Sequence, residues 1–233
     1  MNKNLIRKLI SVGLLFVLIV VFTLSSSYFL TLNNFMEIFR DASVVGIIGI
    51  GVTMVILTAG IDLSTGSMMA LVGMTMANIY RYTLWPIWLM ILIGIAVGVV
   101  AGLFNGIVVT RLHLPEFIAT LSTMNMYRAL TYIIAIKQNG LITSQALKSQ
   151  KYIILGKSIG GVYYVIIAFL VLVVIGQVIL KYTRFGTNLY AVGSNIKAAQ
   201  LSGINTDRTR TMAYMITGFC VGIGAVFTTA RLQ

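Results

Sequence analysis

The stretch YTLWPIWLMILIGIAVGVVAGLFNGIVVT, residues 82–110, decides the class of this protein. It contains no charged side chain, and as an α-helix rising about 1.5 Å per residue it is long enough to cross a hydrocarbon layer of about 30 Å. In lipid, backbone amides must be hydrogen-bonded within the segment, which a helix achieves. The stretch does not show the strict alternation of a membrane β-barrel strand. We therefore predict that residues 82–110 form a membrane-spanning helix.

Six further tracts share this lack of charge, apart from one interruption by Arg128. The 233-residue chain is 58% hydrophobic and 9% charged, far below the roughly 25% charged residues of a soluble domain. We predict an all-α, polytopic membrane protein of about seven spans that forms one transmembrane domain over residues 1–233. Because nothing after Ala230 resembles a terminal tail, we expect a C-terminally truncated member of a larger helical fold. The six tracts are Leu9–Met36, Ala42–Ile61, Leu63–Tyr80, Phe117–Ile136, Ser158–Leu180 and Thr211–Ala230.

The basic residues predict the orientation of the spans. Lys3, Arg7 and Lys8 precede the first tract, which we interpret as a retained span with a cytoplasmic N-terminus. Alternation of the spans then places slightly more basic residues inside than outside. We attribute the net charge of +12 to anchoring in a lipid bilayer with anionic headgroups, and expect no nucleic-acid partner.

The sequence lacks the patterns of catalytic and metal sites. His113 and Cys220 are each single of their kind, which argues against a zinc site or a histidine-based catalytic pair. Gly156-Lys157-Ser158 imitates the end of a P-loop, but Lys151 stands where the first glycine should be. We therefore predict a protein that is not an enzyme and that holds neither a metal nor a cofactor.

Polar residues interrupt the apolar tracts at two places. The stretch GIDLSTGS, residues 60–67, lies between two tracts, and its Asp62 and Ser64 can cap the next helix or line a solute pathway. Arg128 lies near the middle of its tract, where a charge should face protein or water. It can pair with Asp62, bond to the carbonyls of a broken helix or touch a polar solute. The residues alone leave these alternatives open.

Glycines form a regular pattern in the tract quoted first. Gly94, Gly98, Gly102 and Gly106 recur every four residues and so fall on one face of a helix. Small residues on one face let two membrane helices approach closely. The pattern predicts close helix packing and implies no chemistry.

Two polar loops are long enough to do more than connect spans. Gln138–Lys157 is predicted to lie outside and carries the turn signal Asn139-Gly140, so it can meet a partner or act as a lid. Lys181–Arg210 is predicted to lie inside and to contain a helix of about eight residues over 194–202, with Ser194 as its N-cap and Gly203 ending it. So short a helix is marginal in water. It must pack on its own membrane domain or dock to a cytoplasmic partner through Ile196, Ala199 and Leu201.

These stretches together resemble one family. GIDLSTGS is similar to the GIDLSVGS signature of ribose-type sugar ABC-importer permeases. Residues 105–128 resemble the NG…LPPFIATL…YRG region of that family, and Glu116 and the following Ala129 depart from it. Residues 183–204 resemble its TRFGRxxYAxGGNxxAAxLSGI coupling loop, in which Ser194 replaces the second glycine and Lys197 a frequent acid.

The resemblance implies a multi-pass permease subunit of an ATP-driven importer in the bacterial inner membrane, moving ribose or a related monosaccharide. The implied partners are a cytoplasmic ABC ATPase that hydrolyses the ATP, a periplasmic or lipid-anchored sugar-binding protein, and a second permease subunit in a homodimer. An ion-coupled secondary carrier or channel for a small polar solute is the alternative. The scarcity of intramembrane acids counts against it.

The resemblance also assigns residues to two roles. The loop 181–210 is expected to be the cytoplasmic coupling loop, and the few polar side chains of the spans are expected to form the solute pathway or gate. The expected ATPase-coupling residues are Gly193, Ser194, Asn195, Ile196, Ala198, Ala199, Leu201 and Gly203. The expected pathway residues are Asp62, Ser64, Asn105, Asn125 and Arg128.

Overall fold

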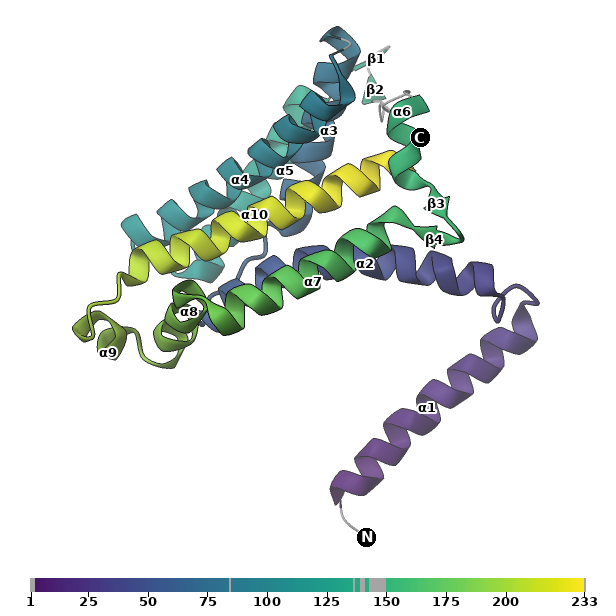
Figure 1. The fold of residues 1–233 in the computed structure, drawn as a ribbon, viewed down its shortest axis with the longest axis horizontal. Coiled ribbons are helices and arrows are strands. Elements are labelled where there is room, and N and C mark those ends of the chain that lie inside the picture. Colours follow the sequence, from purple (N-terminus) through teal and green to yellow (C-terminus); the bar gives the residue numbers. More distant parts are fainter. Residues whose placement is uncertain (1–2, 84, 136, 139–140, 143–149, 233) are drawn as a thin grey trace. The chain divides into compact units, whose positions relative to one another are not determined.

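The computed structural model describes residues 3–83, 85–135, 137–138, 141–142 and 150–232, and these are mainly helical (Figure 1). The long helices are α1 (Lys3–Ser25), α2 (Leu32–Leu57), α3 (Thr65–Thr83), α4 (Ile87–Arg111), α5 (Glu116–Ile134), α7 (Tyr164–Tyr182) and α10 (Thr206–Arg231). The shorter ones are α6 (Gln150–Ile153), the 3-10 turn η1 (Ile154–Gly156), α8 (Arg184–Ser194) and α9 (Ile196–Leu201).

Two short antiparallel hairpins interrupt the helices. β1 (Lys137–Gln138) pairs with β2 (Leu141–Ile142), and β3 (Ser158–Ile159) pairs with β4 (Val162–Tyr163). The predicted turn at Asn139-Gly140 lies outside the described residues. In the second hairpin, Gly160 and Gly161 both have positive φ, 57° and 85°. Two such residues are what the common two-residue hairpin turn requires.

Four described helices are long and apolar enough to cross a membrane, namely α2, α4, α7 and α10. This confirms an all-α, polytopic membrane protein. The helices α1, α3 and α5 coincide with the other three predicted tracts but are not among those four. Seven spans therefore remain a prediction.

The first predicted span, Leu9–Met36, is wrong in its bounds. α1 ends at Ser25, and α2 begins at Leu32 and runs on through three charged residues. Within that stretch Arg40 forms an ion pair with Glu37, one turn earlier. Paired charges are compatible with a helix, so the helix extends farther than the uncharged tract.

The span predicted at Ser158–Leu180 is wrong at its start. Residues 158–163 form the β3–β4 hairpin, and α7 begins only at Tyr164. A count of uncharged residues does not detect a turn made by two glycines, because glycine carries no charge.

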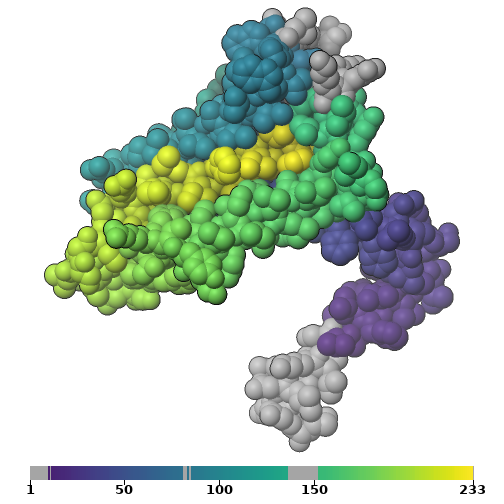
Figure 2. Space-filling view, in the orientation of Figure 1, coloured from purple at the N-terminus to yellow at the C-terminus, as the bar shows by residue number. Residues whose placement is uncertain are grey.

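Contacts divide the chain into two units, residues 1–41 and 42–233, which are described separately. The first contains α1 and the first residues of α2. In the second, α10 lies along α4, with α3 against both and α5 against α3 (Figure 1). The helix α7 lies alongside α10 (Figure 2), and Val165 packs there in a buried cluster with Ile47 and Cys220.

The contact between α4 and α10 is made by glycines on both helices. A Cβ atom at Gly98 would collide with the carbonyl oxygen of Gly218, and one at Gly102 with the carbonyl oxygen of Tyr214. A Cβ at Gly222 of α10 would lie 2.8 Å from the Cα of Ile95. The two backbones therefore touch with no side chain between them.

The predicted glycine stripe is thus confirmed for most of its length. A Cβ at Gly106 would lie 2.8 Å from the Cα of Thr211 on α10. Gly94 differs, since it faces the side chain of Met76 on α3. The spacing predicts the close contact, whereas the identity of the partner helix emerges only from the fold.

Candidate functional site

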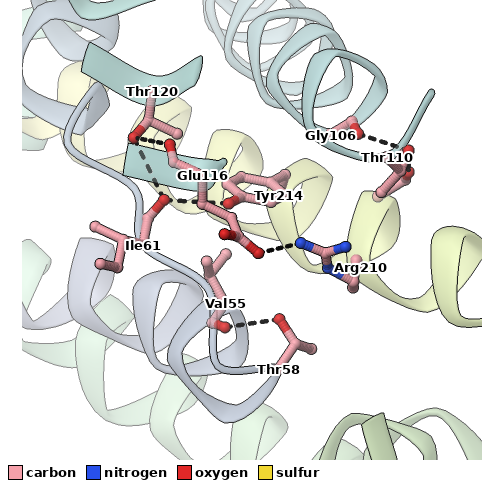
Figure 3. Close-up of polar contacts among 10 residues, drawn as sticks. Val55, Thr58, Ile61, Gly106, Thr110, Glu116, Thr120, Arg210 and Tyr214 are labelled. Carbon is pink, nitrogen blue, oxygen red and sulfur yellow. Dashed lines mark hydrogen bonds and ion pairs between the residues drawn. The ribbon is translucent and has the colours of Figure 1, made fainter. Parts of the chain in front are cut away.

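Residues 58–64 connect α2 to α3 without helical structure, and we call them the break segment. The Thr58 hydroxyl donates a hydrogen bond to the Val55 carbonyl at 2.8 Å and so ends α2 (Figure 3). Ala59 has a φ of 61°, a left-handed conformation that residues other than glycine rarely adopt. The chain therefore leaves α2 through a sharp turn.

Asp62 organises the turn that leads into α3. Its Oδ1 accepts hydrogen bonds from the backbone N–H of Ser64 at 2.9 Å and from the Ser64 hydroxyl at 2.7 Å. Asp62 is 8% exposed, and its Oδ2 is buried without a hydrogen-bond partner among the described residues. Of the alternatives that the sequence left open for Asp62, the geometry favours stabilising the start of α3.

A chain of hydrogen bonds extends from Asp62 into α4 and α5. The Asn105 side-chain amide donates to the Ser64 hydroxyl at 2.7 Å, and the Tyr127 hydroxyl lies 2.8 Å from the Asn105 side-chain oxygen. The same hydroxyl also lies 2.8 Å from the Ala101 carbonyl oxygen. Ser64 and Asn105 are fully buried, and Tyr127 is 2% exposed. A buried hydrogen-bond network of this kind fixes the relative positions of the elements that contribute to it.

The network brings together three of the five predicted pathway residues and adds a fourth member. Asp62, Ser64 and Asn105 meet, although Asn105 is far from the others in the sequence. Tyr127 was not predicted as a pathway residue, because the prediction relied on charge and selected the neighbouring Arg128. Its membership could not be inferred without knowing which face of α5 turns inward.

The other two predicted pathway residues lie elsewhere on α5. Asn125 and Arg128 are exposed, and the described contact of the Asn125 amide is with the Leu121 carbonyl of its own helix, at 3.1 Å. The ion pairs among the described residues do not join Arg128 to Asp62, so the structure does not support that one of the three alternatives for Arg128. The reason is rotational: Tyr127 occupies the inward face of α5, which turns the next residue outward.

The break segment is also held at its centre by two other helices. The Ile61 carbonyl accepts from the Tyr214 hydroxyl of α10 at 3.1 Å (Figure 3). The Thr120 hydroxyl of α5 lies 3.4 Å from the same oxygen and 2.8 Å from the Glu116 carbonyl of its own helix. Near this point Glu116 and Arg210 form an ion pair between α5 and α10. The segment is therefore attached to both helices.

The predicted coupling loop consists of two helices. α9 spans Ile196–Leu201, and its N-cap is Asn195, whose side chain accepts from the Ala198 N–H at 3.0 Å. Ser194 as N-cap is wrong, because Ser194 is the last residue of α8. Gly203, with φ 81°, follows α9 as predicted for a residue that ends a helix.

The helix α8 was missed by the sequence analysis. Its N-cap is Thr183, whose hydroxyl accepts from the Gly186 N–H at 3.1 Å. Phe185, Leu189 and Val192 recur at the spacing of one helix face, and Leu189 is fully buried against α2 and α10. This periodicity was available in the sequence as a signal.

The side chains of α9 point in two directions. Ala199 is 4% exposed, so it packs on its own domain and is wrong as an expected partner contact. Leu201 is 91% exposed and Ile196 36% exposed. One side of α9 therefore packs on the domain, and the other presents apolar side chains outward, where docking to a partner stays a prediction.

Gly193 joins the coupling helices to the break segment. A Cβ at this position would collide with the carbonyl oxygen of Leu57, the last residue of α2. The end of α8 thus lies directly on the backbone from which the break segment begins. The remaining predicted coupling residues Ser194, Asn195 and Ala198 are exposed beside it.

Membrane-length helices, a buried polar break and a short helix pair define a polytopic membrane protein. Residues 34–233 match the family described as the permease component of the branched-chain amino acid transport system. The chain belongs to this permease family, whose members are components of transport systems.

Individual relatives agree with this assignment. The ribose import permease protein RbsC of Haemophilus influenzae is 32% identical over 94% of the chain and 68% of its own length. The D-allose transport system permease protein AlsC of Escherichia coli is 34% identical over 90% of the chain and 63% of its own length. RbsC of Bacillus subtilis is 34% identical over 94% and 67%. The chain thus spans about two thirds of the length of these relatives. No solved structure matches it.

Proposed function

We propose that the chain is the transmembrane subunit of an ATP-driven importer for ribose or a related monosaccharide. The observation that carries the proposal is the 32–34% identity to ribose and allose import permeases over nine tenths of the chain or more. The permease domain comprises residues 1–233, its N-terminus is cytoplasmic, and residues 181–210 form the coupling loop. The chain itself is not catalytic, and a separate cytoplasmic ABC ATPase hydrolyses the ATP.

The coupling role rests on the exposed side of α9. Leu201 and Ile196 expose apolar surface at the end of the molecule where the loop is otherwise polar. An isolated helix of this length is unstable in water, so a partner that encloses it gains apolar burial and fixes it in place. Movement of the ATPase would then reach α8 directly and the break segment through the contact of Gly193 with Leu57.

The pathway role rests on the exposed side of α5. A charge within the membrane must face protein or water, and Arg128 turns away from the interior of its own domain. Two copies of the chain facing each other through this side would enclose a polar passage, and Arg128 and Asn125 would donate hydrogen bonds to sugar hydroxyls. Asp62, Ser64 and Asn105 would act as the gate by holding the break segment in position.

The alternative of an ion-coupled carrier has less support. Such a carrier needs an acid that the coupling ion can reach from water, whereas Asp62 is only 8% exposed and its Oδ1 accepts two hydrogen bonds from Ser64. The ion-pair partner of Glu116 is Arg210. Selectivity for the sugar would reside in a periplasmic or lipid-anchored binding protein that delivers it to the outer side.

The experiment reconstitutes the chain with its co-expressed ATPase and binding protein in liposomes. Leu201→Asp is expected to reduce both co-purification of the ATPase and sugar uptake by about 10-fold or more, because it places a charge in the docked surface. Leu201→Met keeps the surface apolar and should behave as the unmodified chain. Full uptake by Leu201→Asp would overturn the coupling role.

Substrate class is tested in the same liposomes with two radiolabelled solutes, ribose and leucine. The proposal expects ATP-dependent uptake of ribose and no uptake of leucine above the level without ATP. Leucine uptake without ribose uptake would reject a sugar importer while leaving an ATP-driven permease in place.

A further inference from the structure

A pocket of about 610 Å³ lies between the end of α4 and the start of α10, away from the network around Asp62. Its polar end is formed by Arg111 in the last turn of α4 and by Asn205, Asp207 and Arg208 around the start of α10. Arg111 and Arg208 are exposed, and neither forms an ion pair with the described residues. Two cations against one acid leave this end positively charged.

The rest of the pocket follows the two helices away from the arginines and, apart from Thr110 and Thr211, is lined by apolar side chains. Ile107 and Leu103 lie about one and two turns before Arg111 on α4. Met212 and Met215 lie about one and two turns after Arg208 on α10. Ile107 is 42% exposed, although α4 is a helix long and apolar enough to cross a membrane. One end of the pocket therefore suits an anion, and the remainder suits a hydrocarbon chain.

The two walls of the pocket are held at a fixed separation. Thr110 and Thr211 lie within hydrogen-bond distance across the helices, at 3.1 Å, and Gly106 touches the backbone of Thr211. The pocket is consequently formed before any ligand binds, which lowers the cost of binding.

We propose that this pocket binds one anionic phospholipid, with its phosphate between Arg111 and Arg208 and an acyl chain along the apolar wall. Guanidinium groups pair with phosphate oxygens through two parallel hydrogen bonds, and basic pockets between membrane helices suit anionic headgroups. Lipid fits better than a protein partner because the apolar wall belongs to two helices of membrane length. The inference does not depend on which solute is transported.

The test is native mass spectrometry of the full chain, purified in detergent and supplied with phosphatidylglycerol or phosphatidylcholine of the same acyl chains. The unmodified chain should retain phosphatidylglycerol about 10-fold better. Arg111→Gln and Arg208→Gln should each reduce that retention about 5-fold, as expected for one basic residue near a headgroup. Arg184→Gln, which removes an exposed arginine outside the pocket, is the matched control and should change nothing.

Ile107→Trp tests the apolar wall with both arginines in place. It fills the groove, so retention of phosphatidylglycerol should fall about 5-fold while thermal stability stays unchanged. Inorganic phosphate and glycerophosphoglycerol, which lacks acyl chains, should not displace the lipid at millimolar concentration.

Three results would overturn the proposal. The double variant Arg111→Gln/Arg208→Gln could keep its preference for phosphatidylglycerol. Free phosphate or the soluble headgroup could displace the lipid completely, which would indicate an anion site. A photoreactive group at Ile107 could capture a second copy of the chain or the ATPase in place of lipid.

Discussion

The inner face of α4 and the outer face of α5 carry residues that look alike in the sequence but serve in opposite environments. On α4, Asn105 and the glycines are buried against the break segment and α10. On α5, Asn125 and Arg128 are exposed. In an apolar segment, the helix face on which a polar residue lies therefore decides whether that residue is buried within the domain or exposed outside it.

The strongest test of this comparison is Gly102→Leu on the inner face of α4. Because a Cβ here would collide with the Tyr214 carbonyl oxygen, the larger side chain would separate α4 from α10. We expect loss of most of the folded protein, measured as the monodisperse fraction after detergent extraction. Gly49→Leu is the control, since no atom lies within 4 Å of a Cβ at that position. It should leave the yield unchanged or higher, because leucine favours a helix more than glycine does. Equal yields would contradict a backbone contact.

Arg128→Leu tests the outer face. We expect sugar uptake in the reconstituted importer to fall about 10-fold, which corresponds to the loss of one charge-assisted hydrogen bond. Thermal stability should not decrease, because the side chain is exposed. Arg128→Lys retains the charge and should recover part of the uptake. Unimpaired uptake by the leucine variant would remove Arg128 from the pathway.

Asn105 and Asn125 allow the two helix faces to be compared through the same substitution. Asn105→Ala leaves the buried Ser64 hydroxyl without its donor and should cost about 1–3 kcal/mol of unfolding free energy. Asn125→Ala, on the exposed face, should cost less than about 0.5 kcal/mol. Thermal or denaturant unfolding in detergent measures both. If the two variants were equally stable, the distinction between the faces would fail.

Tyr152 of α6 extends the comparison to a buried polar group outside the predicted spans. Its hydroxyl donates to the Val226 carbonyl at 2.8 Å, so Tyr152→Phe should cost about 1 kcal/mol. Burial raises the pKa of Tyr152 from 10.0 to about 12. Because the folded state holds this proton more tightly, the contribution is complete below pH 10 and is lost as the pH rises through about 12.

The pH dependence of the stability difference between the unmodified chain and Tyr152→Phe measures this effect. The difference should be constant at neutral pH and shrink above pH 10. Tyr190→Phe, at a position that is 49% exposed, should change the stability at neutral pH by less than about 0.5 kcal/mol. A difference that did not change at high pH would show that Tyr152 ionises as freely as an exposed tyrosine.

The sequence predicts the helices well because charge is costly in lipid, so uncharged tracts coincide with long helices. It predicts their ends poorly. The turn after Ser25 and the hairpin at Gly160 contain no charge, and the charges of Arg40 and Glu37 are paired within α2. The spacing of the glycines predicts that another helix lies close to α4. It does not identify that helix.

The sequence was enough to predict which types of polar residue form the candidate site. It was not enough to predict which of these residues lie in contact. Asp62 and Ser64 are near neighbours in the sequence, so their hydrogen bonds follow from local turn chemistry. Their connection to Asn105 and Tyr127 depends on the rotation of α4 and α5 about their axes. That rotation is set by packing across the whole bundle, as is the inward position of Ala199 on α9.

The backbone contact between α4 and α10 leaves no compressible layer of side chains between these helices. We therefore expect a displacement of Thr206, where α10 begins after α9, to be passed on to α4, which carries Asn105. We expect α9 and the break segment to share one conformational equilibrium, so that a molecule bound at either place changes the affinity at the other by the same factor.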